Sequence, residues 1–140
     1  MNKYFLDTNF FLDVSDSARK RHAAAVACFN GLLEGDATLC TSSDILTTVA
    51  YFVQKYEDFP RCLDVMEMIA SEVEIVCADN QDFLQLNRIL RELEGRHDYE
   101  DALQFYLADK GGCSHLVTSD VKFCQGLREV FRPLVMGLEG

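Results

Sequence analysis

Acidic residues beside predicted strands and helices are the part of this sequence that could do chemistry. Asp7 and Asp120 each follow a short apolar run. Asp98 and Asp101 stand at the start of one predicted helix, and Asp44 stands at the start of another. Carboxylates gathered in one place destabilise each other unless they are protonated or bridged by a cation. Hard divalent cations prefer oxygen ligands and support phosphodiester hydrolysis, so this set could form a nuclease site.

Each of these acids also has a purely structural interpretation. Asp98 and Asp101 have the spacing of a helix N-cap and its third residue. Asp120 is a good N-cap for a following helix, and Asp44 favours the positive end of a helix dipole. Asp7 is typical of a turn. Composition and periodicity alone therefore do not establish a nuclease, although a shared location at one sheet edge favours a common role.

Short apolar strands alternate with helices along the chain. The predicted strands are 4–6, 37–41, 73–76, 115–118 and 134–136. The predicted helices are 10–14, 19–33, 42–56, 60–70, 79–93 and 98–110, with a short one capped by Asp120. This alternation favours an α/β sandwich with a mostly parallel sheet. Ligand sites of such sheets lie beyond the carboxyl ends of the strands, which is where the acids are expected.

Length and charge bound the possible partners. The 140 residues predict a single domain spanning 1–140, and a hydrophobic content of 49% argues against disorder. A net charge of −10 opposes nonspecific binding to a polyanion, so a nucleic-acid partner needs cations or a local basic patch. Arg19-Lys20-Arg21-His22 is the only dense basic run. Arg19 and Lys20 could steer a nucleic-acid backbone toward the acids, or could simply begin a solvated helix.

The sequence shows no targeting or membrane signal and no zinc-binding pattern of cysteines. The six cysteines include no CxxC pair, which leaves a zinc ribbon unsupported. Neither a signal peptide nor a long apolar run is present, so we expect a cytoplasmic protein, no membrane association and reduced thiols, most of them in the core. The three histidines lack metal-ligand spacing, and the sequence contains no Ser-His-Asp set, P-loop or GxGxxG motif.

Three segments resemble the PIN-domain family. Tyr4-Phe5-Leu6-Asp7-Thr8-Asn9 resembles its opening strand, and Asp98-Tyr99-Glu100-Asp101-Ala102-Leu103-Gln104 resembles its acidic helix start. Leu116-Val117-Thr118-Ser119-Asp120, followed by Phe123, resembles its last acidic strand end. The matches occur in order and span almost the whole chain. The resemblance implies a Rossmann-like, three-layer α/β/α sandwich and a metal-dependent ribonuclease similar to bacterial VapC toxins.

The resemblance also implies roles for individual residues. Carried over by position, Asp7, Asp101 and Asp120 become ligands of one or two Mg²⁺ or Mn²⁺ ions that cleave single-stranded RNA. Asn9 and Thr118 become polar helpers that orient carboxylates or water near the substrate. Asp98 becomes a supporting or alternative acid.

Partners follow from the same resemblance. A small antitoxin is expected to block the site, its basic side chain entering the carboxylate pocket and its apolar helix lying in a neighbouring groove. We also expect a homodimer, because apolar surface at Tyr51, Phe52 and Tyr56 exceeds what one domain covers.

One position departs from the family pattern. The family usually has a glutamate in the helix after the second strand, and this chain has Thr48 there. Asp44 lies one helical turn earlier on the same face and could replace that acid, directly or through water. Alternatively the site has lost a ligand, which leaves a degenerate PIN-like domain that binds RNA or a protein without cutting. A structure-specific nuclease is the other enzyme alternative, disfavoured because the chain has no room for DNA-clamping additions.

Overall fold

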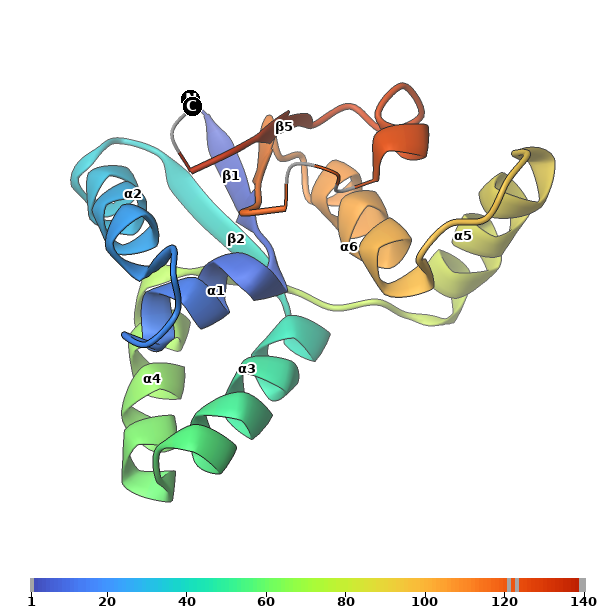
Figure 1. The fold of residues 1–140 in the computed structure, drawn as a ribbon. Coiled ribbons are helices and arrows are strands. Elements are labelled where there is room, and N and C mark those ends of the chain that lie inside the picture. The colour runs from blue at the N-terminus through green and yellow to red at the C-terminus, as the bar shows by residue number, and fades with distance from the viewer. Residues whose placement is uncertain (1, 121, 123, 139–140) are drawn as a thin grey trace.

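Five parallel strands form the centre of the computed structural model, which describes residues 2–120, 122 and 124–138 (Figure 1). The strands lie in the order β3-β2-β1-β4-β5, and all four pairings are parallel. Their bounds are β1 Lys3–Leu6, β2 Thr38–Ser42, β3 Glu74–Val76, β4 His115–Val117 and β5 Leu134–Met136. The predicted parallel sheet is therefore confirmed, with boundaries shifted by one residue in most strands.

Helices cover both faces of this sheet. In Figure 1, α1 to α4 gather on one side and α5 and α6 on the other, which confirms the three-layer α/β/α class. The helices are α1 Thr8–Ser15, α2 His22–Glu34, α3 Ser43–Tyr56, α4 Phe59–Glu72, α5 Asn80–Glu92 and α6 Tyr99–Lys110, with a 3₁₀ turn, η1, at Gln125–Leu127. Among the described residues, no helix is long and apolar enough to cross a membrane.

Arg19, Lys20 and Arg21 of the basic run lie outside the helix in which they were predicted. The prediction of a helix from residue 19 is wrong, because α2 begins at His22. Asp16 holds the preceding residues in turns instead: its Oδ1 accepts a hydrogen bond from the Ala18 N–H at 2.9 Å, and its carbonyl accepts one from the Arg19 N–H at 3.1 Å. Within this α1–α2 connection, the side chains of Arg19 and Arg21 contact other segments of the fold, at Asp13 and at the Ser119 carbonyl.

The short helix predicted after Asp120 is not found among the described residues. The Asp120 carboxylate accepts a hydrogen bond from the Lys122 N–H at 3.0 Å, which closes a turn. The only helical piece nearby is η1, which starts at Gln125 after Cys124 in a left-handed backbone conformation. Phe123, part of the third matching segment, lies outside the described residues.

The core lies where the sheet meets the helices, and two large apolar side chains of the helices lie outside it. Phe5 and Leu6 of β1 are fully buried, as their apolar run predicts. Leu63 of α4 and Phe83 of α5 are apolar, yet they are 46% and 41% exposed. These helices bury other residues instead, namely Cys62, Val65 and Ile69 in α4 and Leu86 in α5.

The cysteines follow the expected state in part. All six thiols are free, and Cys40, Cys62 and Cys113 are buried. Cys77 is exposed and two others are half-buried, so fewer lie in the core than the sequence led us to expect.

A buried carboxylate fixes α6 against α5. Asp82 is 4% exposed and accepts hydrogen bonds from Lys110 Nζ at 2.6 Å and the Tyr106 hydroxyl at 3.1 Å. It also closes a capping box with Asp79 at the start of α5. Burial alone would raise its pKa, but these hydrogen bonds and the Lys110 charge lower the pKa below its ordinary value. The network anchors the carboxyl-terminal end of α6, whose first turn carries Asp101.

Candidate functional site

Asp7 lies at the carboxyl end of the central strand. It caps α1 by accepting a hydrogen bond from the Phe10 N–H at 2.8 Å, so the predicted turn is a helix N-cap. Its own N–H donates to the Val117 carbonyl of β4, 3.2 Å away. The side chain is 2% exposed. A carboxylate at this point is held in place by the backbone of two neighbouring strands and one helix.

Burial gives this carboxyl an unusual proton affinity. Desolvation, together with the smaller effect of the charges of Asp101 and Asp120, raises the pKa of Asp7 to about 7. Hydrogen bonds from the Thr118 hydroxyl and the Phe10 N–H act in the opposite direction without cancelling the effect. Asp7 is therefore poised between its protonated and charged forms near neutral pH.

Asp101 faces Asp7 from the first turn of α6. Asp98 caps this helix by accepting a hydrogen bond from the Asp101 N–H at 3.0 Å, as the spacing of the two acids predicted. Burial raises the pKa of Asp101 to about 6, and the charges of Asp98, Asp120 and Glu100 add to the effect. The Asp101 backbone thus takes part in the N-cap of α6, while its side chain belongs to a group of mutually repelling carboxylates.

The turn after β4 brings the third acid to the same place. Thr118 is 1% exposed, and its Oγ1 accepts a hydrogen bond from the Asp120 N–H at 3.0 Å. The same hydroxyl donates to the Asp7 side chain. Ser119, between them, offers its carbonyl to the Arg21 guanidinium. Thr118 therefore links two of the acids rather than facing open solvent.

The fold places Asp7, Asp101 and Asp120 close together at the carboxyl end of the sheet. Each pair of these carboxylates is near enough for one charge to raise the pKa of the other. The donor set consists of carboxylate oxygens, which suits a hard divalent cation. Within residues 2–120, 122 and 124–138, however, no three Asp, Glu, His or Cys side chains already have a geometry that could hold a metal ion.

Glu100, which the sequence analysis did not single out, lies in the same region. Burial raises its pKa, followed by the charges of Asp44 and Asp98, so α3 and α6 both direct an acid toward this point. Thr48, at the position of the family glutamate, donates its hydroxyl to the Asp44 carbonyl of its own helix at 3.2 Å. Of the two α3 residues considered, Asp44 is therefore the one whose charge reaches the α6 acids.

Gln104 is the other residue that the sequence analysis missed. Its side chain is 2% exposed, and its Nε2 donates to Thr8 Oγ1 at 3.2 Å and to Glu100 Oε1 at 3.3 Å. It therefore connects the first turns of α1 and α6. A polar residue one turn after Glu100 on a largely buried helix was the signal in the sequence that could have indicated this role.

The residues predicted to meet substrate line a cleft beside the acids. Asn9, Arg19 and Lys20 all border this cleft of about 360 Å³, and Asp120 forms part of its wall. Thr118 does not line it. The cleft is therefore open to a ligand that also contacts the carboxylates.

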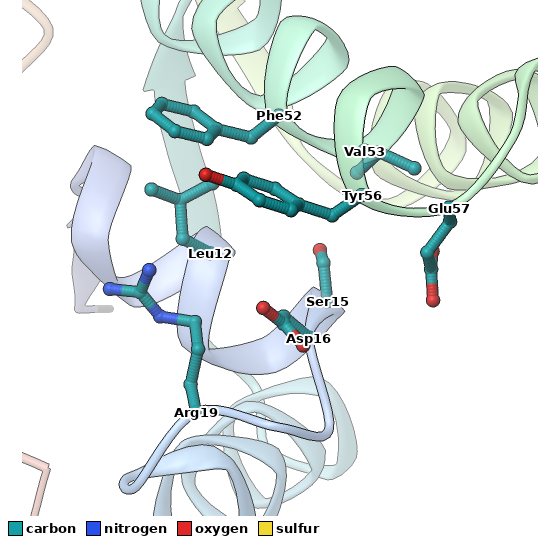
Figure 2. A pocket seen from close by; sticks show the side chains of 8 residues that line it. All are labelled: Leu12, Ser15, Asp16, Arg19, Phe52, Val53, Tyr56 and Glu57. Carbon is teal, nitrogen blue, oxygen red and sulfur yellow. The ribbon is translucent and has the colours of Figure 1, made fainter.

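A separate and more apolar groove runs between α1 and α3 (Figure 2). In Figure 2 the rings of Phe52 and Tyr56 line the α3 side, while Leu12 and Ser15 line the α1 side. The two rings stack at 6.1 Å between centroids. The groove has a volume of about 270 Å³ and includes none of the predicted acids. It lies beside the candidate site, because Arg19 borders both hollows.

Replacing Thr118 with valine tests the link between the acids. Valine has nearly the same shape but removes the hydroxyl that donates to Asp7 and accepts from the Asp120 N–H. We expect the free energy of unfolding to fall by about 2 kcal/mol because buried polar groups lose their partners. We also expect the pKa of Asp7 to rise further, since that hydrogen bond lowers it.

Chemical denaturation and NMR titration of carboxyl groups would measure the two effects. Thr118→Ser keeps the hydroxyl and should leave the pKa of Asp7 close to the wild-type value. An equal change in both variants would mean that packing of the methyl group, not the hydrogen bond, matters.

Comparison with known proteins identifies the family. The PIN domain matches residues 3–122 of the chain. Ribonuclease VapC1 of Aquifex aeolicus (strain VF5) is 31% identical over 121 residues, which cover 86% of this chain and 83% of that protein.

Two solved structures share the fold. Mycobacterium tuberculosis VapC20, described as a sarcin-ricin loop cleaving toxin, has a TM-score of 0.71 at 16% identity, covering 88% of this chain and 94% of that one. VapBC2 from Rickettsia felis, bound to a DNA fragment from its promoter, has a TM-score of 0.72 at 18% identity, covering 96% and 98%. With the matched residues spanning most of its length and a relative above 30% identity, the chain belongs to the PIN-domain family.

Proposed function

We propose that this chain is a single PIN domain and a metal-dependent endoribonuclease that cleaves single-stranded RNA as the toxin of a bacterial toxin–antitoxin pair. The observation that carries the proposal is the meeting of Asp7, Asp101 and Asp120 at the carboxyl edge of the sheet, where burial and mutual repulsion raise the pKa of two of them. The ribonuclease named above, at 31% identity, supports the same activity.

Asp7, Asp101 and Asp120 are the residues proposed to hold Mg²⁺ or Mn²⁺. Their fit to the ion rests on donor chemistry and on their unfavourable proximity, since a divalent cation relieves repulsion between carboxylates. When bound, the ion supplies a positive charge that activates water and stabilises the leaving oxygen of a phosphodiester. Because no described group of three is already arranged for a metal, binding must draw these side chains closer.

The remaining residues of the site hold the acidic side chains in place or contact the substrate. Thr118 holds Asp7 and the Asp120 backbone in register through one hydroxyl. Asp98 orients Asp101 by capping its helix. Burial and the charges of Asp44 and Asp98 raise the pKa of Glu100, and Gln104 holds its carboxyl in place through a hydrogen bond. Asn9, Arg19 and Lys20 are proposed to contact the substrate strand along the neighbouring cleft.

A cleavage assay tests this function directly. The purified chain is incubated with labelled single-stranded and double-stranded RNA in Mn²⁺, Mg²⁺ or EDTA. Cleavage of the single strand that requires the cation supports the proposal. RNA binding without cleavage under all conditions would instead favour a degenerate PIN domain, the alternative kept open by the missing glutamate at Thr48.

Asp44 is proposed to take over from the missing glutamate. Asp44→Asn removes a charge that acts on Glu100, so we expect cleavage to fall by about 10-fold, as for a residue that supports a metal site indirectly. Thr48→Ala should change the rate less than twofold, because its hydroxyl only returns to its own helix. Single-turnover rates in saturating Mn²⁺ would compare the two. A larger loss in Thr48→Ala would reverse the assignment.

Two protein partners are proposed. An antitoxin is expected to place an apolar helix in the α1–α3 groove of Figure 2 and a basic side chain among the carboxylates. VapBC2, a fold relative of this chain, supports such a pairing. A homodimer is expected because Tyr51, which does not line that groove, is 58% exposed. We propose that the pair acts in the cytoplasm, where its RNA substrate is made.

Light scattering tests both partners. Two results are expected: a dimeric mass for the chain alone at micromolar concentration, and a heavier complex after co-expression with a small basic protein if one is encoded in the neighbouring reading frame. A monomeric mass, with no binding to such a protein, would contradict both the homodimer and the antitoxin pairing.

A further inference from the structure

The cleft beside the carboxylates is locally basic on an acidic protein. We call it the basic cleft, lined by Asn9, Asp13, Arg19, Lys20, Arg21, Ser119 and Asp120. Its wall carries three cations against two carboxylates, whereas the chain as a whole has a net charge of −10. Because the overall field repels a polyanion, any attraction for phosphate must act at short range, and in this cleft cations lie beside Asp120.

Two of the three cations have partners within the protein. Arg19 Nε pairs with the Asp13 carboxylate at 2.7 Å, and Asp13 is only 4% exposed. The Arg21 guanidinium donates to the Ser119 carbonyl, on the turn that carries Asp120. These contacts fasten the α1–α2 connection to α1 on one side and to the Asp120 turn on the other.

The third cation is left without a partner. Lys20 is exposed, and within the described residues it forms no hydrogen bond or ion pair. It lies in sequence between the two arginines that fix the connection. The fold therefore holds an unneutralised ammonium group at the rim of the basic cleft. Asn9, also exposed and two residues beyond Asp7, offers an amide donor on the same cleft.

We infer that the basic cleft binds the phosphate group that neighbours the scissile phosphate of a single-stranded RNA, with Lys20 as the cation that contacts it. The inference rests on the ribonuclease function proposed above and adds the path of the strand. An ammonium group binds phosphate as a point charge and needs no fixed fork geometry, which suits an exposed, mobile side chain. Arg21 acts as a positioning residue that holds the connection in place, while Arg19, paired with Asp13 through its Nε, also borders the cleft.

Steady-state kinetics of Lys20→Gln tests this role. We expect KM for single-stranded RNA to rise by about 3- to 10-fold at 0.1 M salt, with kcat within about twofold, because the contact binds substrate without touching the reacting atoms. The slope of log(1/KM) against log[salt] should become shallower by about 0.7, the contribution of one phosphate on a single strand. Lys20→Arg restores the charge and should recover most of the affinity.

Arg88→Gln is the matched control. Arg88 is exposed on α5, hydrogen-bonds only to Gln85 at 3.0 Å among the described residues, and its loss changes the net charge by the same single unit. It should leave KM and the salt slope unchanged. Identical behaviour of Lys20→Gln and Arg88→Gln, with active wild-type enzyme, would overturn the inference alone. A wild-type chain that cleaves no RNA would overturn the proposed function and the inference together.

Discussion

Replacing Asp7 with asparagine is expected to stabilise the metal-free protein while abolishing most of its activity. Asparagine keeps the size of the side chain and an oxygen that accepts the Phe10 N–H, so the cap of α1 survives. What it removes is a carboxylate that is 2% exposed and whose pKa is raised to about 7. A shift of about three pKa units corresponds to about 4 kcal/mol of unfavourable free energy in the charged form.

The expected gain in unfolding free energy at pH 8 is about 3 kcal/mol, after subtracting about 1 kcal/mol for the weakened hydrogen bond with Thr118. Cleavage should nevertheless fall at least about 100-fold, because one of the three carboxylates proposed to hold the cation loses its charge. The stabilisation that Mn²⁺ gives to the wild-type protein should also largely disappear. Thermal and chemical unfolding with and without Mn²⁺, beside a cleavage assay, would measure these effects.

Asp82→Asn is the control for this experiment. Asp82 is buried to a similar degree, but it pairs with Lys110 away from the site, and its pKa is lowered rather than raised. Its neutralisation should destabilise the protein and leave the response to Mn²⁺ intact. Unchanged cleavage in Asp7→Asn would remove Asp7 from the site. A loss of stability equal to that of Asp82→Asn would mean that its carboxylate is satisfied in the fold.

The stability of the metal-free protein is expected to decrease between acid and neutral pH. Asp7 binds its proton more tightly in the folded chain, with a pKa of about 7, than its ordinary value of 3.8 allows in the unfolded chain. The stability contributed by that proton is complete below pH 3.8 and is lost as the pH rises through about 7. Asp101, with a pKa of about 6, acts in the same direction, with a smaller effect because solvent reaches it.

The expected decrease between pH 4 and pH 8 is therefore about 4 kcal/mol from Asp7 alone. Saturating Mn²⁺ should flatten or reverse the slope, because the ion favours the deprotonated carboxylates. Below pH 4 the trend should turn, because Asp82, whose pKa is lowered, contributes stability that is lost as its carboxylate takes up a proton.

Urea denaturation at a series of pH values, with EDTA or with Mn²⁺, would give both curves. The Asp7→Asn variant should show a much shallower slope in EDTA. A flat profile for the metal-free wild-type chain would show that the acids do not repel one another as their burial indicates.

The fold class and the location of the main acids could be predicted from the sequence because they depend on local patterns. A strand buried between two helical layers must be a short apolar run, and Tyr4-Phe5-Leu6 ends at the first polar residue beyond the core. Parallel strands all end at the same edge, so residues that follow them meet there. That rule places Asp7 and Asp120 together, although many residues separate them.

Other properties depended on contacts between distant segments and were decided only in the tertiary structure. Sequence spacing placed Arg21 in a helix, whereas its guanidinium meets the Ser119 carbonyl 98 residues away. Sequence spacing also gave no sign of Glu100 as a site residue. Its raised pKa arises from burial and from the charge of Asp44 on another helix. Leu63 has the apolar character of a core residue, but the packing of α4 leaves it exposed.

The physical reason is that some properties depend on interactions between residues near in sequence and others on contacts between distant segments. Helix caps, apolar strands and their order follow from interactions over a few residues, which a single sequence displays. Burial, desolvation and the balance between neighbouring charges depend on which segments pack together. The sequence therefore determined that Asp7, Asp101 and Asp120 stand at one edge of a parallel sheet. Only the packing of β4, α1 and α6 decided that the carboxyl of Asp7 is almost completely shielded from water and shares the Thr118 hydroxyl with the Asp120 turn.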